Sequence, residues 1–200
     1  MSIQNVEARL DRIVSALDAQ IRSIEKHGAT EYYGSLFDEI VAADYFVTTG
    51  LGRSRHIADK ISASLASTGT PSYFVDSSDD PTHLKRLTSR DRLLIVHRRG
   101  ESGERVANLI AHLGADVPFD VITDHPEGWP KRIGKLLPLS APEHVAPNVE
   151  PDLLALATGD SLLAGLESAR KFTEFDFLKD HPKGSLGKNI SAAQQQGAAK

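Results

Sequence analysis

The sequence predicts an α/β fold in which a doubly wound, parallel five-stranded sheet lies between helices and follows a long amphipathic helix. Three observations predict it. Short apolar runs alternate with helical stretches from about residue 45 onward, as in parallel strands joined by crossover helices. Residues 3–24 carry apolar side chains at helical spacing. The 200 residues contain no internal repeat and no dividing linker, which indicates one domain.

The first predicted helix comes before every predicted strand. Arg, Asp and Gln residues separate the members of its apolar stripe. We therefore expect this helix to pack on the outside of the domain or against a second subunit. A second helix is predicted over residues 32–43. The apolar stripe of the first helix consists of Ile3, Val6, Leu10, Ile13, Val14, Leu17, Ile21 and Ile24.

Five apolar runs of strand length follow, separated by segments with helical spacing. In the first of these segments, Ile57, Ile61 and Leu65 recur every four residues. A long helix is predicted from about Asp152 to Arg170, and a short one around residues 174–179. The small polar residues of 191–200 predict a disordered tail. The predicted strands cover residues 45–49, 72–75, 93–97, 119–123 and 136–139.

The composition argues against several classes of partner and site. A net charge of −4 gives no basic surface for nucleic acid or for an anionic membrane. The absence of cysteine removes disulfides, thiolate zinc sites and cysteine nucleophiles, and fits a reducing cytoplasm. No apolar run approaches the roughly 18 residues of a membrane-spanning helix. The eight histidines lack the spacing of a metal site, so we expect no bound metal. The lack of cysteine and of a long apolar run leads us to expect a cytoplasmic protein.

The stretch "VTTGLGRSRHI", residues 47–57, joins a predicted strand to a predicted helix through two glycines, Gly50 and Gly52. Such a turn can hold an anion at the start of the helix. A dinucleotide site needs a third glycine where this chain has Arg55, although Asp76 after the next strand suits a ribose hydroxyl. The residues alone leave three interpretations: a dinucleotide site, a single-phosphate site using Ser54, and a turn without a ligand.

Two blocks of the sequence resemble the arabinose-5-phosphate isomerase family of the sugar isomerase (SIS) superfamily. The first, "TGLGRSRHIADKISASLASTGTPSYFV", is similar to the family's "TGxGKSGHIxxKxAATxASTGTPxFFV". The second, "FTEFDFLKDHPKGSLGK", is similar to "FTxxDFAxxHPGGxLGR". The resemblance implies a single SIS domain over residues 1–190, with an N-terminal helix in 1–30 and the α/β core and C-terminal helices in 45–190. We expect the chain to lack the pair of CBS domains found in most family members.

The resemblance also implies a reaction that interconverts aldose and ketose phosphates by moving a proton between neighbouring carbons. A carboxylate can carry this proton and an imidazole can open the sugar ring, so no cofactor is required. His181 matches the family histidine of "HPGG", which often reaches the site of a neighbouring subunit. Glu101 matches the glutamate of the family's "SNSGES", and Glu143 matches a second family glutamate. These three are the candidate catalytic residues.

The phosphate-binding positions of the family are only partly kept. Arg53 replaces the family lysine, and an arginine binds or polarises but does not carry a proton at neutral pH. The family's "SNSGES" reads "HRRGES" over residues 97–102. Its two arginines can bind phosphate through charge-assisted hydrogen bonds, fill the pocket or face solvent. The candidate anion-binding residues are Gly50, Gly52, Arg53, Ser54, Arg98, Arg99, Gly100 and Ser102.

Three functional hypotheses stay open at this point. The leading one is an isomerase that interconverts arabinose 5-phosphate and ribulose 5-phosphate through an enediol. The second is an SIS domain that has lost catalysis and binds a sugar phosphate in a regulatory role. A nucleotide-binding enzyme is the third. We expect a homodimer or homotetramer, because the terminal helices present apolar stripes and related domains build sites across subunits.

Overall fold

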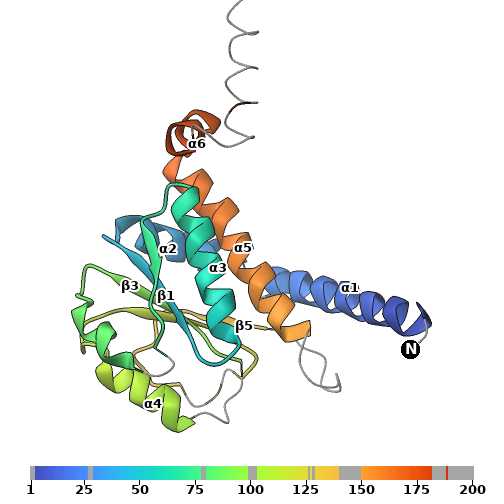
Figure 1. The fold of residues 1–200 in the computed structure, drawn as a ribbon, viewed down its shortest axis with the longest axis horizontal. Helices are drawn as coiled ribbons and strands as arrows, with labels where there is room; N and C mark the ends of the chain where they lie inside the picture. Colours follow the sequence, from blue (N-terminus) through green and yellow to red (C-terminus); the bar gives the residue numbers. More distant parts are fainter. Residues whose placement is uncertain are drawn as a thin grey trace, which may run out of the picture.

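A computed structural model describes residues 3–26, 29–77, 80–98, 103–125, 127, 129–139, 150–181 and 188. A central sheet lies between two layers of helices, as predicted (Figure 1). The tail predicted over 191–200 lies outside the described residues.

All five predicted strands are present and parallel. Their order across the sheet is β2-β1-β3-β4-β5. Every residue of β1, β3 and β4 is buried, since helices cover both faces, which explains why these strands read as continuous apolar runs. The predicted fold class is therefore confirmed. The strands are β1 (Phe46–Gly50), β2 (Ser72–Phe74), β3 (Arg92–Val96), β4 (Phe119–Thr123) and β5 (Leu136–Pro138).

The helices form two layers around separate hydrophobic clusters. One cluster packs α2, α3 and α5 onto the sheet and includes Leu36, Ile61 and Leu162. The other packs α4 and a 3-10 helix, η1, onto the opposite face and includes Leu84 and Leu109. The helices are α1 (Ile3–Lys26), α2 (Ala29–Ala42), α3 (Ser54–Ser67), η1 (Pro81–Arg86), α4 (Gly103–His112), α5 (Glu150–Arg170) and α6 (Glu174–Asp180).

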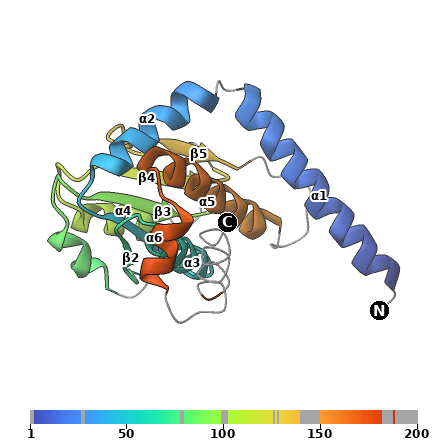
Figure 2. The same ribbon diagram turned by 90° about the horizontal axis from the view of Figure 1, so that it is seen from above.

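Helix α1 packs on the outside of the domain through part of its length. Ala16 is buried, and the Gln20 side-chain amide donates a hydrogen bond of 3.0 Å to the carbonyl of Pro138. Toward its N-terminus the helix extends away from the body of the domain (Figure 2). Leu10, Val14 and Ile21 are 56%, 65% and 57% exposed, so part of the predicted apolar stripe has no cover within the described chain.

A buried ion pair joins the starts of β3 and β4. Arg92 donates two hydrogen bonds, of 2.5 and 2.7 Å, to the two carboxylate oxygens of Asp120. Burial raises the pKa of the Asp120 carboxyl, and the hydrogen bonds from Arg92 act in the opposite direction. Within the described part of the chain, no helix is long and apolar enough to cross a membrane.

Candidate functional site

The sheet order places the candidate site at the carboxyl ends of β1 and β3. The chain leaves β1 toward β2 on one side, and β3 lies on the other side, so ligand-binding loops meet at this switch point. Gly50 and Val96, the last residues of the two strands, are register partners. The glycine turn and the residues that follow β3 are therefore neighbours, as expected for two parts of one anion site.

Glycine is required at the two positions of the turn for different structural reasons. A Cβ on Gly50 would lie 2.7 Å from the Ser54 carbonyl carbon and 2.8 Å from the Arg55 nitrogen. Both are backbone atoms, so only glycine allows the strand end to approach the first turn of α3 this closely. Gly52 has open space around it but adopts φ +60, a left-handed conformation that favours glycine.

The start of α3 has no side-chain cap. Arg53 occupies the N-cap position with helical backbone angles and makes no capping hydrogen bond. The amides of Ser54 and Arg55 instead donate long hydrogen bonds of 3.3 and 3.4 Å to carbonyls within the turn. Ser54 itself is 5% exposed. An anion at this turn would therefore meet a helix N-terminus whose amides are held only by weak local bonds.

Arg98 leaves the end of β3 and is bound by carboxylates. Its Nη1 donates a 2.7 Å hydrogen bond to Oδ1 of Asp152, and its Nε lies 3.8 Å from Oδ2 of Asp124. Asp124 directly follows β4, and Asp152 lies in the first turn of α5, where the helix dipole favours a negative charge. The Arg98 side chain is only 9% exposed. This guanidinium thus connects β3, β4 and α5 at one edge of the sheet.

Asp152 also faces the glycine turn. Its Oδ2 lies 3.9 Å from Nη2 of Arg53, which is beyond hydrogen-bond distance. The Arg53 side chain is 64% exposed, whereas that of Asp152 is 22% exposed. Two arginines and two aspartates therefore gather at this edge, and their formal charges cancel. We call Arg53, Arg98, Asp124 and Asp152 the charge cluster.

Asp124 and His97 connect the charge cluster to the loop after β4. The Asp124 carboxylate lies 2.9 Å from Nδ1 of His125, and the indole nitrogen of Trp129 donates to the His125 carbonyl. His97 is 5% exposed and meets the Trp129 ring edge to face, with ring centroids 6.1 Å apart. Trp129 packs against the hydrophobic cluster that includes Leu84 and Leu109, between the sheet and α4. This loop is therefore held by packing as well as by charge.

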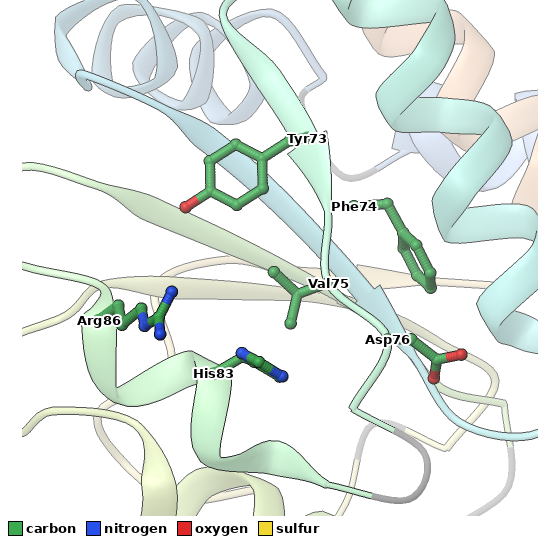
Figure 3. A pocket seen from close by; sticks show the side chains of 6 residues that line it. All are labelled: Tyr73, Phe74, Val75, Asp76, His83 and Arg86. Carbon is green, nitrogen blue, oxygen red and sulfur yellow. The ribbon is translucent and has the colours of Figure 1, made fainter.

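A cavity of about 410 Å³ lies beside the exposed edge of β2. Tyr73 and Val75 point toward η1, which carries His83 and Arg86, whereas Asp76 points toward α3 (Figure 3). There Arg55 donates a 3.1 Å hydrogen bond to Asp76, so the cavity adjoins the first turn of α3. None of the described residues predicted for the site lines it. The lining residues are Tyr73, Phe74, Val75, Asp76, His83 and Arg86.

His181 lies far from the glycine turn within its own chain. Helix α5 starts beside Arg98 and ends at Arg170, whose Nη2 donates a 3.4 Å hydrogen bond to the carbonyl of Ile40. Ile40 lies in the last turn of α2, which precedes the amino end of β1, whereas the glycine turn follows its carboxyl end. Its 21 residues span about 30 Å. His181 then follows α6, at the far end of α5 (Figure 1). Its ring stacks on Phe177 with a centroid distance of 4.3 Å.

Several predicted site residues cannot be placed. The catalytic candidates Glu101 and Glu143, and the anion-binding candidates Arg99, Gly100 and Ser102, lie outside the described residues. Of the others, the structure brings Gly50, Gly52, Arg53, Ser54 and Arg98 together. Among the residues it describes, no group of three histidine, aspartate or glutamate side chains could hold a metal ion.

Sequence reasoning missed both aspartates of the charge cluster. One signal was available for each. Asp124 is the first residue after a predicted strand, at the sheet edge where ligand sites form, and Asp152 begins a predicted helix. Neither signal predicts which basic side chain the carboxylate meets, because that depends on how α5 packs across the sheet.

Solved structures with the same fold include a sugar isomerase domain and a sugar-phosphate complex. The sugar isomerase domain of an RpiR transcription factor from Sphaerobacter thermophilus matches with a TM-score of 0.62 and 19% identity, over 86% of this chain and 98% of that one. An Escherichia coli CFT073 protein in complex with a sugar phosphate matches with a TM-score of 0.66 and 22% identity, over 91% of this chain and all of that one. These likenesses show that the chain has the fold of those proteins. No protein-family model matches it.

The chain also has curated relatives in sequence. The arabinose 5-phosphate isomerase KdsD of Shigella flexneri is 36% identical over 152 residues. That alignment covers 72% of this chain and 46% of the relative, so the chain spans about half the length of the curated relative. The chain therefore belongs to the arabinose-5-phosphate isomerase family, as the resemblance implied, and corresponds to the family's sugar isomerase (SIS) domain.

Proposed function

We propose that this SIS domain interconverts arabinose 5-phosphate and ribulose 5-phosphate. The observation that carries the proposal is the 36% identity to an arabinose 5-phosphate isomerase over nearly three quarters of the chain. The glycine turn supports it, since Gly50, Gly52 and Ser54 keep both the family's residues and the geometry of an anion site. The relatives favour catalysis over a purely regulatory role.

The proposed reaction moves one proton from C2 to C1 and one from O2 to O1, and it leaves the oxidation state of the protein unchanged. Glu101 or Glu143 removes the proton from C2 of the open-chain aldose while O1 gains a proton, which gives the enediol. The enediol is then reprotonated at C1 as the O2 hydroxyl loses its proton, which gives the ketose. His181 assists ring opening by giving and taking a proton at the ring oxygen and the anomeric hydroxyl. The phosphate lies at the glycine turn, held by Arg53, Ser54 and the candidate residues 99–102.

A homodimer or homotetramer completes this site. Because α5 separates His181 from the glycine turn of its own chain, the imidazole would serve the turn of another subunit. The uncovered stripe of Leu10, Val14 and Ile21 on α1 supplies an apolar surface for such contacts. We expect a mass above that of one chain by light scattering, and a Val14→Lys variant to shift toward the monomer. We place this activity in the cytoplasm, in keeping with the absence of cysteine.

Thermal stabilisation followed by a turnover assay tests the function. We expect arabinose 5-phosphate to raise the melting temperature and to be converted to ribulose 5-phosphate. A Glu101→Gln variant should retain binding and lose most turnover if Glu101 is the base, and Glu143→Gln is the matched alternative. Binding by the unmodified chain with no ketose formed would reject catalysis and support the regulatory hypothesis.

A further inference from the structure

We propose that the two arginines of the charge cluster have separate tasks. Arg53 leaves Asp152 to bind the substrate's phosphate, and Arg98 is a positioning residue that keeps its carboxylates. This inference rests on the proposed function for the identity of the substrate. It goes beyond that function because it assigns Asp152 a role as an internal anion with which the phosphate competes.

Arg98 has the geometry of a structural ion pair. Its Nη1 donates to Asp152 at 2.7 Å, its Nε faces Asp124 at 3.8 Å, and its side chain is 9% exposed. Moving it to a ligand would leave two largely buried carboxylates without this cation, which is unfavourable. Holding it in place fixes the end of β3 against the starts of α5 and of the loop after β4. The chain therefore leaves β3 from a fixed point.

Arg53 has the opposite character. Its side chain is 64% exposed, and its 3.9 Å contact with Asp152 is an ion pair without a hydrogen bond. Little is lost when such a pair separates. Arg53 also lies between Gly52 and Ser54, at the turn proposed for the phosphate. A phosphate offers its guanidinium paired acceptor oxygens and at least one full negative charge, which the distant Asp152 oxygen does not match.

The two carboxylates of the charge cluster offset its two arginines, so the competition between phosphate and Asp152 for Arg53 can be measured by removing one carboxylate. With Asp152 ionised, a phosphate must approach a carboxylate as well as two arginines. Removing the Asp152 charge should therefore strengthen anion binding, although the residue lies in the site. A simple supporting role for Asp152 predicts the reverse, since loosening the site weakens binding.

A double-mutant cycle on the full chain tests this, with calorimetric binding of inorganic phosphate and of arabinose 5-phosphate. We expect Arg53→Gln to weaken phosphate binding by about tenfold or more, with an unchanged melting temperature. Asp152→Asn should tighten binding by up to about fivefold and lower the melting temperature. In the Arg53→Gln background, Asp152→Asn should tighten binding less than it does in the unmodified chain. Asp124→Asn, which removes a carboxylate that does not face Arg53, is the matched control and should tighten binding less.

Arg98→Lys tests the positioning role, because lysine keeps the charge but not the fork of donors. We expect it to lower the melting temperature and kcat while the dissociation constant for phosphate stays within about twofold, a change far smaller than the loss of a charge-assisted bond. If Arg98→Lys loses phosphate binding to the same extent as Arg53→Gln, then Arg98 is itself a phosphate ligand and the proposal is overturned. Unaltered phosphate binding by Arg53→Gln would also overturn the proposal; this variant is expected to fold because the side chain of residue 53 is exposed. An unmodified chain that binds neither inorganic phosphate nor arabinose 5-phosphate would overturn it too. Binding without turnover by the unmodified chain rejects the proposed function alone.

Discussion

Gly50 and Gly52 lie two residues apart and limit the site in different ways. Gly50 is confined by backbone atoms of Ser54 and Arg55, which cannot move without displacing α3. Gly52 is confined only by its own φ of +60. The sequence shows two glycines in a turn, and only the structure separates a requirement for space from a requirement for conformation.

This difference predicts unequal effects of alanine. Gly52→Ala should cost about 1 kcal/mol of unfolding free energy, the cost of a left-handed residue with a Cβ. Gly50→Ala should cost about 3 kcal/mol and abolish phosphate binding, because the turn must open to accept the methyl group. Urea unfolding and phosphate calorimetry measure the two effects. Equal effects of the two substitutions would contradict this account of the turn.

The residues of the site were predictable where a local motif carries them. The glycine turn, Arg53 and Ser54 follow from a strand, a turn and a helix that are contiguous in sequence. The partners of Arg98 were not predictable, because Asp124 and Asp152 come from two distant elements. Charge complementarity indicates that such partners exist, and only the packing of α5 decides which residues they are.

At the scale of elements, α3 and α5 pack closely because Gly159 leaves room for Ile61. A Cβ on Gly159 would overlap the side chain of Ile61, which is fully buried. The two helices also share an ion pair between Lys60 and Asp160 at the surface. These helices carry Ser54 and Asp152 at their N-terminal ends, so their spacing helps to set the width of the candidate site.

Gly159→Ala should therefore destabilise the domain by about 1–3 kcal/mol, the usual cost of overpacking a core. Ile61→Val alone should cost about 1 kcal/mol. Because valine lacks the Cδ1 atom that the new methyl group would meet first, the double variant should lose less than the sum of the two. Denaturant midpoints measure all three variants. Simple additivity would show that the helices separate rather than repack.

Helix α6 begins with a capping box. The Thr173 side chain accepts from the Asp176 amide, and the Asp176 carboxylate accepts from the Thr173 amide and hydroxyl. These hydrogen bonds hold the pKa of Asp176 below its ordinary value. The folded state thus favours the carboxylate, so its stabilisation is present above about pH 4 and is lost as the pH falls through the lowered pKa.

Amide hydrogen exchange of residues 174–180 measures this effect. At pH 7, Asp176→Ala should exchange faster than the unmodified chain, and the difference should shrink below about pH 4. Glu174→Ala is the control, because Glu174 lies in the same first turn but outside the capping box. A difference between Asp176→Ala and the unmodified chain that persists at low pH would show that the cap does not depend on the carboxylate.

The elements were predictable from the sequence with small errors at their ends. Strands β1 and β3 each shift by one residue from the prediction, and β4 coincides with it. A buried parallel strand is a short apolar run, and the helices on either side of it carry apolar residues at helical spacing, so both can be recognised from the local sequence. Helix α2 begins at Ala29 rather than at residue 32, because a helix start without a strong capping residue leaves little trace in the sequence.

At the scale of the whole molecule, the two ends of the described chain lie outside the α/β core. Helix α1 leaves Leu10 and Val14 uncovered, and α6, which precedes His181, lies at the far end of α5 from the glycine turn. The sequence predicts that the first helix lies outside the core, but the periodicity of its apolar stripe does not indicate what covers that stripe. Both arrangements are explained if, in the proposed assembly, α1 packs against a neighbouring subunit and His181 reaches that subunit's glycine turn.

Complementation tests that arrangement. Arg53→Gln and His181→Ala homo-oligomers should each have little activity. Mixed oligomers, made by unfolding and refolding the two variants together, should regain a measurable fraction, because some sites combine an intact turn with an intact imidazole. Refolding each variant alone is the control. No recovery in the mixture would place His181 at a site of its own subunit or outside catalysis.

The central claim is that this domain moves a proton between C2 and C1 of a pentose phosphate. The most direct measurement is proton NMR of arabinose 5-phosphate incubated with the chain in D₂O. We predict ribulose 5-phosphate that carries deuterium at C1, together with loss of this label in the variant of whichever glutamate is the base. Arabinose 5-phosphate that keeps its C2 proton, with no ketose formed while the sugar is bound, would contradict the account.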